Sequence, residues 1–294
     1  METLSVMFRD VIKEVSVRSK TSTIVTEHNV YQTGQKEIVP LIDTIITALI
    51  LPGSGIGGRA YLYELLRLAQ SGKSCLLLLE HYSNLDLPIF SYLLRKEAGG
   101  AETADAIVAI AGMKLNESSP TVAAFSGAYT RIVIYPSRSL QGLDAEKDRT
   151  EIVRSNAINR AAMKTLLEVK HQGKLILVFP SGTRYRPWDQ STKKGVREID
   201  SYIKTFDYMC CVAINGEILH LRPGNMLDDY ISTDVVRCTA GPVISCTEFR
   251  NAVRAKAEAT GIADKKQAVA DAVMEQLNLM HLEAEKERQQ ILKR

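Results

Sequence analysis

The stretches LLLLEHYSNLD at residues 76–86 and LILVFPSGTRYR at residues 175–186 decide the fold of this chain. Each begins as an apolar run of strand length and then turns polar. In an open sheet of mostly parallel strands, binding sites lie beyond the carboxyl ends of the strands. The polar halves of both stretches are therefore predicted to lie at one functional site.

The rest of the chain continues this alternation of apolar strand patterns and helical patterns. We predict strands at Ser74–Leu79, Asp105–Ala111, Arg131–Tyr135, Lys174–Phe179, Cys211–Ile214 and Asp234–Cys238. We predict helices between them at Leu87–Ala98, Arg149–His171 and Lys194–Thr205. The pattern indicates an α/β fold, with a mixed, mostly parallel sheet flanked by helices on both faces.

The two ends of the chain read as helical. Apolar residues from Leu4 to Val15 recur at helical spacing, Ile38–Leu51 reads as an apolar helix, and Arg59–Gln70 follows as another. We predict a small helical N-terminal domain over residues 1–72 and an α/β domain over residues 73–294. A stripe of apolar residues from Val269 to Met280 docks a C-terminal helix on the second domain.

Composition narrows the classes of function. The net charge of +3 on 294 residues is too small to indicate nucleic-acid binding. The five cysteines form no CxxC pair, and the acidic residues near the start argue against a targeting peptide, so we expect a reduced, cytoplasmic protein. The longest apolar stretch, Ile38–Pro52, is too short to span a bilayer. Contact with a membrane is therefore expected to be at most peripheral, on its inner face.

His81 and Asp86 are the first candidate catalytic pair. Histidine suits a general base because its unperturbed pKa is about 6.5, and a carboxylate can fix its tautomer and stabilise the imidazolium. Ser83 or Asn84 is expected to cap the helix that follows. The alternative is that His81 only ends a strand and Asp86 only begins a helix. No metal or other cofactor is indicated, since His81 lacks nearby ligands at zinc spacing.

Arg184 and Arg186 are the candidate phosphate ligands. Alternate residues of an extended segment point the same way, so both guanidinium groups can engage one phosphate. Gly182, just before them, allows a close approach of the backbone. Arg131 is a further candidate for the same duty, or else it only begins a strand.

Taken together, these blocks resemble the glycerolipid acyltransferases, which carry a histidine and an aspartate separated by four residues and, downstream, an FPEGT-like block. The chain is most similar to the soluble, plastid-type glycerol-3-phosphate acyltransferases, whose PSGGR-type block has a second arginine. The resemblance covers roughly residues 71–216. It includes the intervening stretches AGMKLNESSP (111–120), IVIYPSRS (132–139) and RSNAINRAAMKTL (154–166).

The resemblance implies a glycerol-3-phosphate 1-O-acyltransferase of phospholipid biosynthesis. Its acyl donor would be a thioester of acyl carrier protein or coenzyme A. His81 would be the base and Asp86 its orienting partner, with Arg138, Arg184 and Arg186 as the phosphate ligands. Those relatives carry a second basic residue after the position of Arg138, whereas this chain has Ser139. The alternative acceptor is 1-acylglycerol 3-phosphate.

Two further groups of residues have expected roles under this interpretation. The first group shapes the loop or holds the oxyanion, and it consists of Ser181, Gly182 and Thr183. The second group docks an acidic carrier protein, or is merely solvated, and it consists of Lys193, Lys194 and Arg197.

A different class of function rests on GSGIGG at residues 53–58. This glycine pattern follows an apolar run and precedes a helix, and Glu80 comes 22 positions after Gly58. That imitates the nucleotide-binding turn of a dinucleotide-dependent oxidoreductase. Pro52 crowds such a turn, and the preceding apolar run is long for a first strand. The structural interpretation is a loop between two domains.

Overall fold

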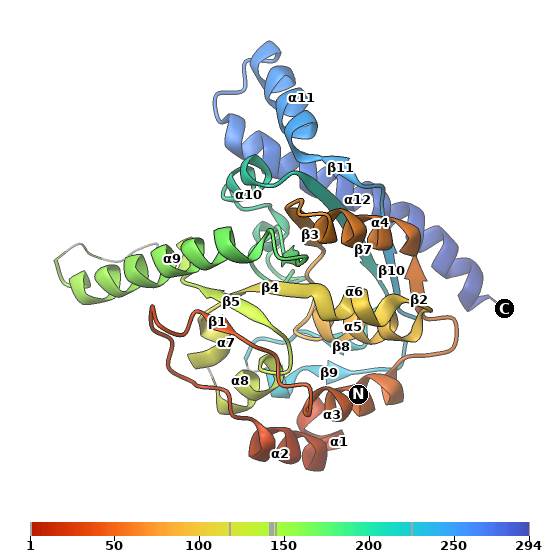
Figure 1. Ribbon diagram of the computed structural model, residues 1–294. Helices are drawn as coiled ribbons and strands as arrows, with labels where there is room; N and C mark the ends of the chain where they lie inside the picture. Colours follow the sequence, from red (N-terminus) through yellow and green to blue (C-terminus); the bar gives the residue numbers. More distant parts are fainter. Residues whose placement is uncertain (1, 118, 141–143, 145, 225, 294) are drawn as a thin grey trace.

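The computed structural model describes residues 2–117, 119–140, 144, 146–224 and 226–293 (Figure 1). Its centre is a nine-stranded mixed sheet with the order β1-β5-β4-β6-β3-β7-β10-β2, and β11 also pairs with β7. The parallel centre consists of β3 (Cys75–Leu79), β4 (Ile107–Gly112), β5 (Arg131–Ile134), β6 (Leu175–Val178) and β7 (Tyr208–Asn215). The remaining strands are β1 (Tyr31–Gln32), β2 (Gly55–Gly57), β10 (Arg237–Ala240) and β11 (Ile244–Ser245), with a separate pair β8 (Leu219–His220) and β9 (Tyr230–Ile231). The predicted α/β fold with a mostly parallel sheet is confirmed.

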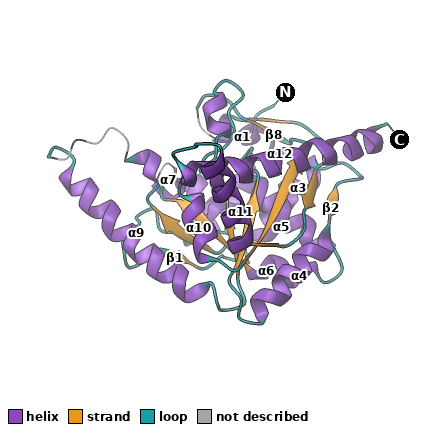
Figure 2. Cartoon of the chain, turned by 90° about the horizontal axis from the view of Figure 1, so that it is seen from above, coloured by secondary structure: helices purple, strands orange, loops and turns teal. Residues whose placement is uncertain are grey.

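Helices cover both faces of this sheet, and the strands lie in the interior (Figure 2). One face carries α1 (Leu4–Met7), α2 (Arg9–Arg18), α3 (Val39–Leu49), α4 (Arg59–Gln70), α5 (Asp86–Lys96), α6 (Gly100–Ala106), α7 (Lys114–Glu117) and α8 (Pro120–Ser126). The other face carries α9 (Arg149–Val169), α10 (Ile199–Thr205), α11 (Cys246–Ala259) and α12 (Lys265–Leu292). Among the described residues, no helix combines the length and the apolarity that crossing a membrane requires.

The central strand β3 is a continuous apolar run because it is covered on both sides. Leu77 and Leu79 pack into the core beneath α3 and α5, whereas Leu76 and Leu78 pack into the core beneath α9 and α12. All four side chains are fully buried. Burying each one stabilises the fold by about 1.5–3 kcal/mol. The apolar run that predicted this strand therefore also explains why β3 lies inside the sheet, between β6 and β7.

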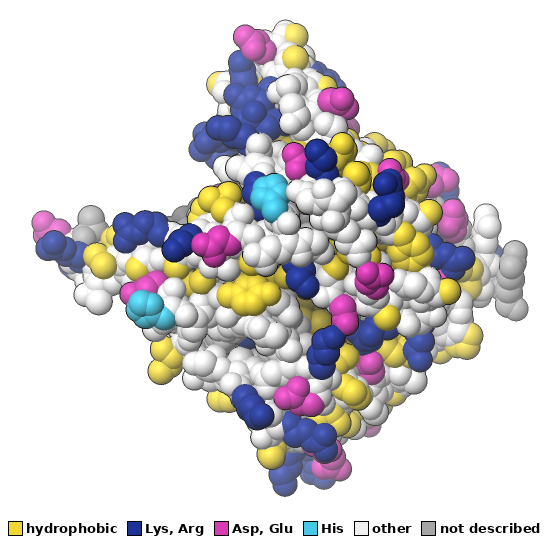
Figure 3. All heavy atoms as spheres, viewed as in Figure 1, with side chains coloured by type: hydrophobic (Ala, Val, Ile, Leu, Met, Phe, Trp, Pro, Cys, Tyr) yellow, Lys and Arg dark blue, Asp and Glu magenta, His cyan; other side chains and the backbone are white. Residues whose placement is uncertain are grey.

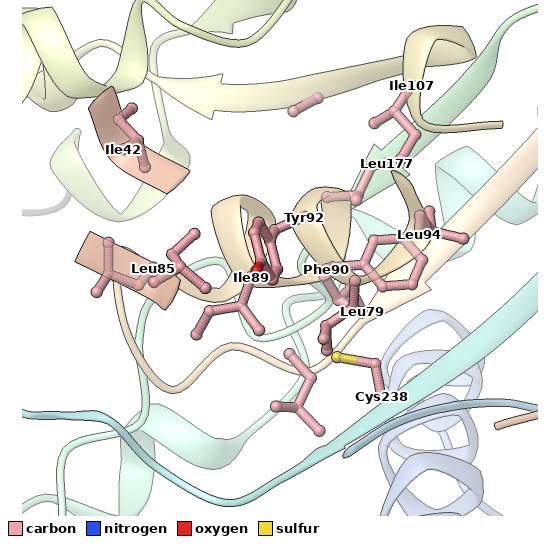
Figure 4. Close-up of a cluster of buried hydrophobic side chains, with 14 of the residues drawn as sticks. Ile42, Leu79, Leu85, Ile89, Phe90, Tyr92, Leu94, Ile107, Leu177 and Cys238 are labelled. Atoms are coloured by element: carbon pink, nitrogen blue, oxygen red, sulfur yellow. The ribbon is translucent and has the colours of Figure 1, made fainter. Parts of the chain in front are cut away.

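The first 72 residues share this sheet and core with the rest of the chain. Strand β1 pairs with β5, and β2 pairs with β10. Figure 4 shows Ile42 of α3 in the same cluster as Leu79 of β3 and Phe90 of α5. Whether residues 1–72 and residues 73–294 fold as two separate domains stays a prediction. Within the segment 38–51, α3 spans Val39–Leu49 and turns one face to the core, where Ile45 and Ile46 are fully buried.

Within the glycine segment at residues 53–58, Gly55–Gly57 form the edge strand β2, whereas a loop was expected there. Its β2 residues lie beside β10, close enough that a Cβ on Gly57 would be 3.1 Å from the Thr239 hydroxyl. Gly58 has a φ of 67°, and a Cβ there would lie 2.1 Å from the carbonyl oxygen of Ala240. Close packing against β10 therefore accounts for these glycines without a dinucleotide.

Two other boundaries differ from the prediction. The helix expected from Lys194 begins at Ile199, because residues Gln190–Lys193 form a 3-10 turn and Gly195 packs tightly against α12. The strand expected at Asp234–Cys238 is β10, which begins three residues later and ends two residues later than predicted. It runs antiparallel to β7. The start of α10 is therefore set by the preceding 3-10 turn and the contact of Gly195 with α12, and the bounds of β10 are set by its pairing with β7.

Gly58→Ala should destabilise the protein far more than Gly72→Ala. Both glycines have positive φ, but a Cβ added at Gly72 would have no atom within 4 Å. We expect about 1–2 kcal/mol for the left-handed backbone alone and at least about 2 kcal/mol more at Gly58 for displacing a buried carbonyl. Urea unfolding of both variants measures the difference. Equal losses of stability would contradict the close packing of β2 on β10.

Candidate active site

The carboxyl ends of three parallel strands of the sheet, β3, β6 and β5, carry the predicted site residues, with β4 between β6 and β5. His81 follows β3, Arg138 lies in a 3-10 turn after β5 (Ser137–Ser139), and the segment 181–186 follows β6. The imidazole Nδ1 of His81 lies 2.9 Å from a carboxylate oxygen of Asp86, the first residue of α5. The predicted pair is therefore in hydrogen-bonding contact. With Nδ1 donating to the carboxylate, Nε2 is left to accept a proton.

Asp86 is 2% exposed, and its carboxylate is surrounded by hydrogen-bond donors. It accepts the backbone N–H of Tyr82 at 2.6 Å, the N–H of Ser83 at 2.9 Å and the Ser83 hydroxyl at 2.9 Å. These bonds hold residues 81–86 in a tight turn around the charge. The expected side-chain cap at Ser83 or Asn84 is wrong: Leu85 is the N-cap of α5 and makes no such bond.

His81 is fixed on its other sides by the segment that follows β6. Its ring stacks on Phe179, with centroids 3.9 Å apart and planes inclined by 18°. Its backbone carbonyl accepts the N–H of Tyr185 at 2.8 Å. The side chain of His81 is 16% exposed, so the imidazole is both oriented and accessible. The two sequence blocks thus hold each other in place.

Arg184 lies within electrostatic reach of Arg186, and Arg186 and Arg138 both lie within reach of Asp189. Burial lowers the pKa of Arg184, and the positive charge of Arg186 adds to this effect, whereas Asp229 and Asp86 oppose it. The pKa of Asp189 is lowered first by a hydrogen bond from Ser191 and also by the charges of Arg186 and Arg138. Positive charge therefore gathers beside the His81–Asp86 pair. Such a site favours an anionic group.

A largely apolar cavity opens beside His81. It has a volume of about 570 Å³, and its lining includes His81, Arg138, Phe179 and Gly182. Further lining residues come from β4, β5, α8 and α9, among them Ala111, Phe125, Ile132 and Leu166. Its size and apolar walls are those of a small-molecule site with few polar groups. A base, a cluster of cations and an apolar cavity therefore meet at one edge of the sheet.

The sequence matches the model of a protein family described as Acyltransferase over residues 61–209, just over half of the chain. The chain belongs to the acyltransferase family. The matched region begins in α4 and ends in β7, so it contains His81, Asp86, Arg138 and the segment 181–186. The recognised glycerolipid acyltransferase resemblance is thereby confirmed at the level of the family.

The other comparisons are more distant. No curated protein matches the sequence. Among solved structures, the chain is similar to the 1-acyl-sn-glycerophosphate (LPA) acyltransferase PlsC from Thermotoga maritima, with 13% identity and a TM-score of 0.38. That match covers 95% of this chain and 83% of the other.

In this acyltransferase, the loop after β6 is shaped by its own hydrogen bonds. The Ser181 hydroxyl donates to the carbonyl oxygen of Thr183 at 2.6 Å, and the Gly182 N–H donates to the carbonyl oxygen of Phe179 at 2.9 Å. The Gly182 amide is thus engaged in a turn, and its alternative role at the oxyanion stays a prediction. Gly182 adopts a φ of 64°. Loop shaping is the role that the geometry supports for this group.

The residues expected to dock a carrier protein are not equivalent. Lys193 lies over the ring of Tyr185, 5.4 Å from its centroid, and Arg197 pairs with Asp264 at 2.9 Å. Lys194 is exposed. Figure 3 shows Lys and Arg side chains gathered beside α11, on the side toward α10 and the start of α12, a basic surface that the sequence analysis did not single out. Of the basic residues of α11, Arg250 and Arg254 pair with the buried carboxylate of Asp200, at 2.7 Å and 3.7 Å.

The sequence analysis missed Asp229, an acidic neighbour of the arginines. Asp229 is 1% exposed, and one of its carboxylate oxygens lies 3.7 Å from Arg184. Burial raises its pKa, while the backbone N–H of Arg222 and the charge of Arg184 act in the other direction. Its long spacing of 43 to 45 positions from the arginine segment gives no sequence signal. Asp229 is thus a buried acidic neighbour of Arg184, at a distance longer than a hydrogen bond.

Glu80 and His281 form a second contact that the sequence analysis missed. Glu80 is 5% exposed and accepts the Tyr82 hydroxyl at 3.0 Å, the Ile214 N–H at 2.8 Å and Nδ1 of His281 at 2.9 Å. His281 belongs to α12, far outside the matched region. Burial and the charge of Glu80 raise the pKa of Tyr82. The C-terminal helix therefore supports the turn that carries His81.

His81→Ala should lower kcat for acyl transfer by about a hundredfold to ten-thousandfold, because a general base contributes that much to such steps. The fold should be retained, since the imidazole borders the cavity. His171→Ala is the matched control, because His171 is exposed and its Nδ1 lies 3.0 Å from the carbonyl oxygen of Gly72, at the opposite end of β3 from His81. Steady-state kinetics and circular dichroism measure both effects. Near-normal turnover by His81→Ala would refute the assignment.

His281→Ala should lower kcat by about tenfold with little change in KM, because loss of one donor to a buried carboxylate lets the His81 turn shift. His281→Asn, which keeps a donor close to the position of Nδ1, should recover most of the activity. Leu282→Ala is the control on the same helix, since Leu282 is 55% exposed. If His281→Ala and Leu282→Ala behave alike, the contact with Glu80 does not position the base.

Proposed function

We propose that the protein transfers an acyl group from a thioester to a hydroxyl group of a glycerol-phosphate acceptor. The observation that carries the proposal is the meeting of the His81–Asp86 pair, an arginine cluster and an apolar cavity at one site. Acyl transfer requires a base for the hydroxyl proton, a grip on the acceptor and room for the acyl chain. Each requirement has a group of residues to meet it.

The reaction begins when Nε2 of His81 removes the proton of the acceptor hydroxyl. The hydroxyl oxygen attacks the thioester carbonyl and forms a tetrahedral intermediate. The carbon–sulfur bond then breaks, and the leaving thiolate takes the proton from the imidazolium. Asp86 stabilises the imidazolium between these steps through the 2.9 Å contact with Nδ1. No acyl-serine intermediate is needed, because the Ser181 hydroxyl is engaged with the Thr183 carbonyl.

The arginines would bind the phosphate of the acceptor. Arg184 is the central one, because it lies within electrostatic reach of both Arg186 and Asp86. Its loose contact with Asp229, at 3.7 Å, leaves guanidinium N–H groups for a phosphate oxygen. Arg138 lines the cavity and would approach the phosphate from the strand β5 side. This placement holds the acceptor hydroxyl near His81.

Two acceptors carry the required phosphate and hydroxyl. The sequence resemblance implies glycerol 3-phosphate, which would make the product a 1-acyl derivative. The alternative is 1-acylglycerol 3-phosphate, the acceptor in the name of the Thermotoga maritima enzyme. Membership in the acyltransferase family is compatible with both. The acyl donor is a thioester of coenzyme A or of acyl carrier protein, and the basic surface beside α11 would suit the acidic carrier.

An assay of both acceptors with both donors tests the proposal. With its acceptor, the protein should release thiol and form a new ester. Arg184→Ala should raise the KM for that acceptor about tenfold or more, with a smaller effect on kcat. The reason is that a phosphate contact stabilises the bound acceptor and the transition state equally. Arg67→Ala, an exposed arginine of α4, is the control.

The outcomes separate the interpretations. Acylation of glycerol 3-phosphate in detergent-free buffer would establish the first acceptor. Activity only with 1-acylglycerol 3-phosphate presented in vesicles would establish the second. Failure to consume either thioester with either acceptor would refute the proposed function.

A further inference from the structure

The sheet stops supporting the chain directly after β5. On the β1 side, the N–H of Val133 donates to the carbonyl oxygen of Val30 at 2.7 Å. On the β4 side, the carbonyl oxygen of Ile134 accepts the N–H of Met113 at 2.9 Å. Because neighbouring residues of a strand direct their main-chain hydrogen bonds to alternate sides, the main-chain groups of Tyr135 face the β1 side again. Among the described residues, no main-chain group bonds to Tyr135 there.

The side chain of Asn159 takes the place of the missing strand. Its Oδ1 accepts the N–H of Tyr135 at 2.8 Å, and its Nδ2 donates to the carbonyl oxygen of Tyr135 at 3.0 Å. A carboxamide carries the same kinds of donor and acceptor as a peptide group, so one side chain satisfies both main-chain groups. Main-chain groups left without a partner inside a protein are costly. Asn159 therefore extends the hydrogen bonding of β5 by one residue.

The packing of α9 directs Asn159 toward β5. The buried residues of this helix recur three or four positions apart, at Ser155, Ile158, Ala162 and Leu166. Residues at that spacing share one face of a helix, so these side chains fix the rotation of α9 about its axis. Asn159 stands at the edge of this face and lines the cavity beside His81. Turning Asn159 away from β5 would expose the fully buried Ile158.

A second contact holds the same part of the chain from β4. Gly112 is the last residue of β4 and the partner of Ile134 in the parallel ladder. A Cβ added at Gly112 would lie 2.9 Å from Cγ of Pro136, so the proline ring packs directly on the glycine. Tyr135 and Pro136 are therefore held by groups from two different elements. The chain leaves β5 in one defined direction.

That direction decides where Arg138 lies. Arg138 comes three residues after Tyr135, in the 3-10 turn that follows β5. The N–H of Ser139 donates to the carbonyl oxygen of Pro136 at 2.9 Å and ties the turn to its first residue. Arg138 lines the cavity from this turn. A shift of Tyr135 is thus transmitted to Arg138 over a short, internally bonded segment.

We propose that Asn159 is a positioning residue for phosphate binding, because it fixes the turn from which Arg138 reaches the phosphate of the acceptor. This inference rests on the proposed function insofar as Arg138 binds that phosphate. Asn159 needs no contact with the acceptor, since its oxygen and its nitrogen are both engaged with Tyr135. Small displacements of a binding group are enough to lose much of its effect.

Phosphate binding to a catalytically inactive protein tests the inference apart from turnover. The His81→Ala protein is titrated with inorganic phosphate and with glycerol 3-phosphate by calorimetry. Asn159→Ala in this protein should weaken the binding of both ligands at least about fivefold, because the turn loses two hydrogen bonds. Asn156→Ala is the matched control and should leave both affinities unchanged, since Asn156 is an exposed asparagine of the same helix.

A double-mutant cycle with Arg138→Ala separates positioning from a general loss of stability. Arg138→Ala should weaken phosphate binding about tenfold while Asn159 is present, and less than about threefold in the Asn159→Ala background. Circular dichroism checks that each variant is folded. Where Asn159→Ala fails to fold, the cycle is run with Asn159→Ser, a neutral side chain that cannot bond both main-chain groups of Tyr135. Fold-changes that simply multiply would overturn the inference.

The remaining outcomes distinguish this inference from the proposed function. Phosphate binding that Arg138→Ala weakens but Asn159→Ala does not would overturn the inference and leave the proposed function standing. Coupled effects of the two variants on phosphate binding, without acyl transfer to any acceptor, would refute the proposed function while the role of Asn159 stands. Absence of phosphate binding, or binding that ignores Arg138→Ala, would overturn the inference together with the assignment of Arg138 as a phosphate ligand.

Discussion

The structure of the site depends on one buried charge, the carboxylate of Asp86. A carboxylate that is 2% exposed is tolerated only because backbone amides, a hydroxyl and an imidazole donate to it. Those donors come from the turn that links β3 to α5, so satisfying the charge also fixes the shape of the turn. The orientation of His81 follows from the same bonds. The position of the base is thereby tied to the stability of the fold.

The central strands extend this constraint to the rest of the site. Because β3, β5 and β6 run in parallel, the segments after them meet at one edge, with His81, Arg138 and the arginine segment side by side. Phe179 and Tyr185 connect the two key segments through ring stacking and a backbone hydrogen bond. The apolar cavity runs from this edge back along the sheet. The chemistry and the space for a ligand are therefore products of one arrangement of strands.

Sequence reasoning recovered those parts that local patterns encode. The five central strands, the helix Arg59–Gln70 and the contact between His81 and Asp86 all follow from apolar runs and short spacings. The edge strands β1 and β2 were missed because they are two and three residues long and are stabilised by distant partners. Asp229 and His281 were missed for the same reason, since each reaches the site only through tertiary packing. The hydrogen bonds from Asn159 to Tyr135 are visible only in three dimensions.

The contact between Glu80 and His281 joins residues 201 positions apart. Loops of that length close slowly, and a chain leaving the ribosome folds its N-terminal parts first. The nascent protein therefore passes through a stage in which β3 and α5 exist but the turn between them lacks its support from α12. A chain truncated before α12 is therefore expected to form the central sheet while the turn that carries His81 lacks one of its hydrogen-bonded supports.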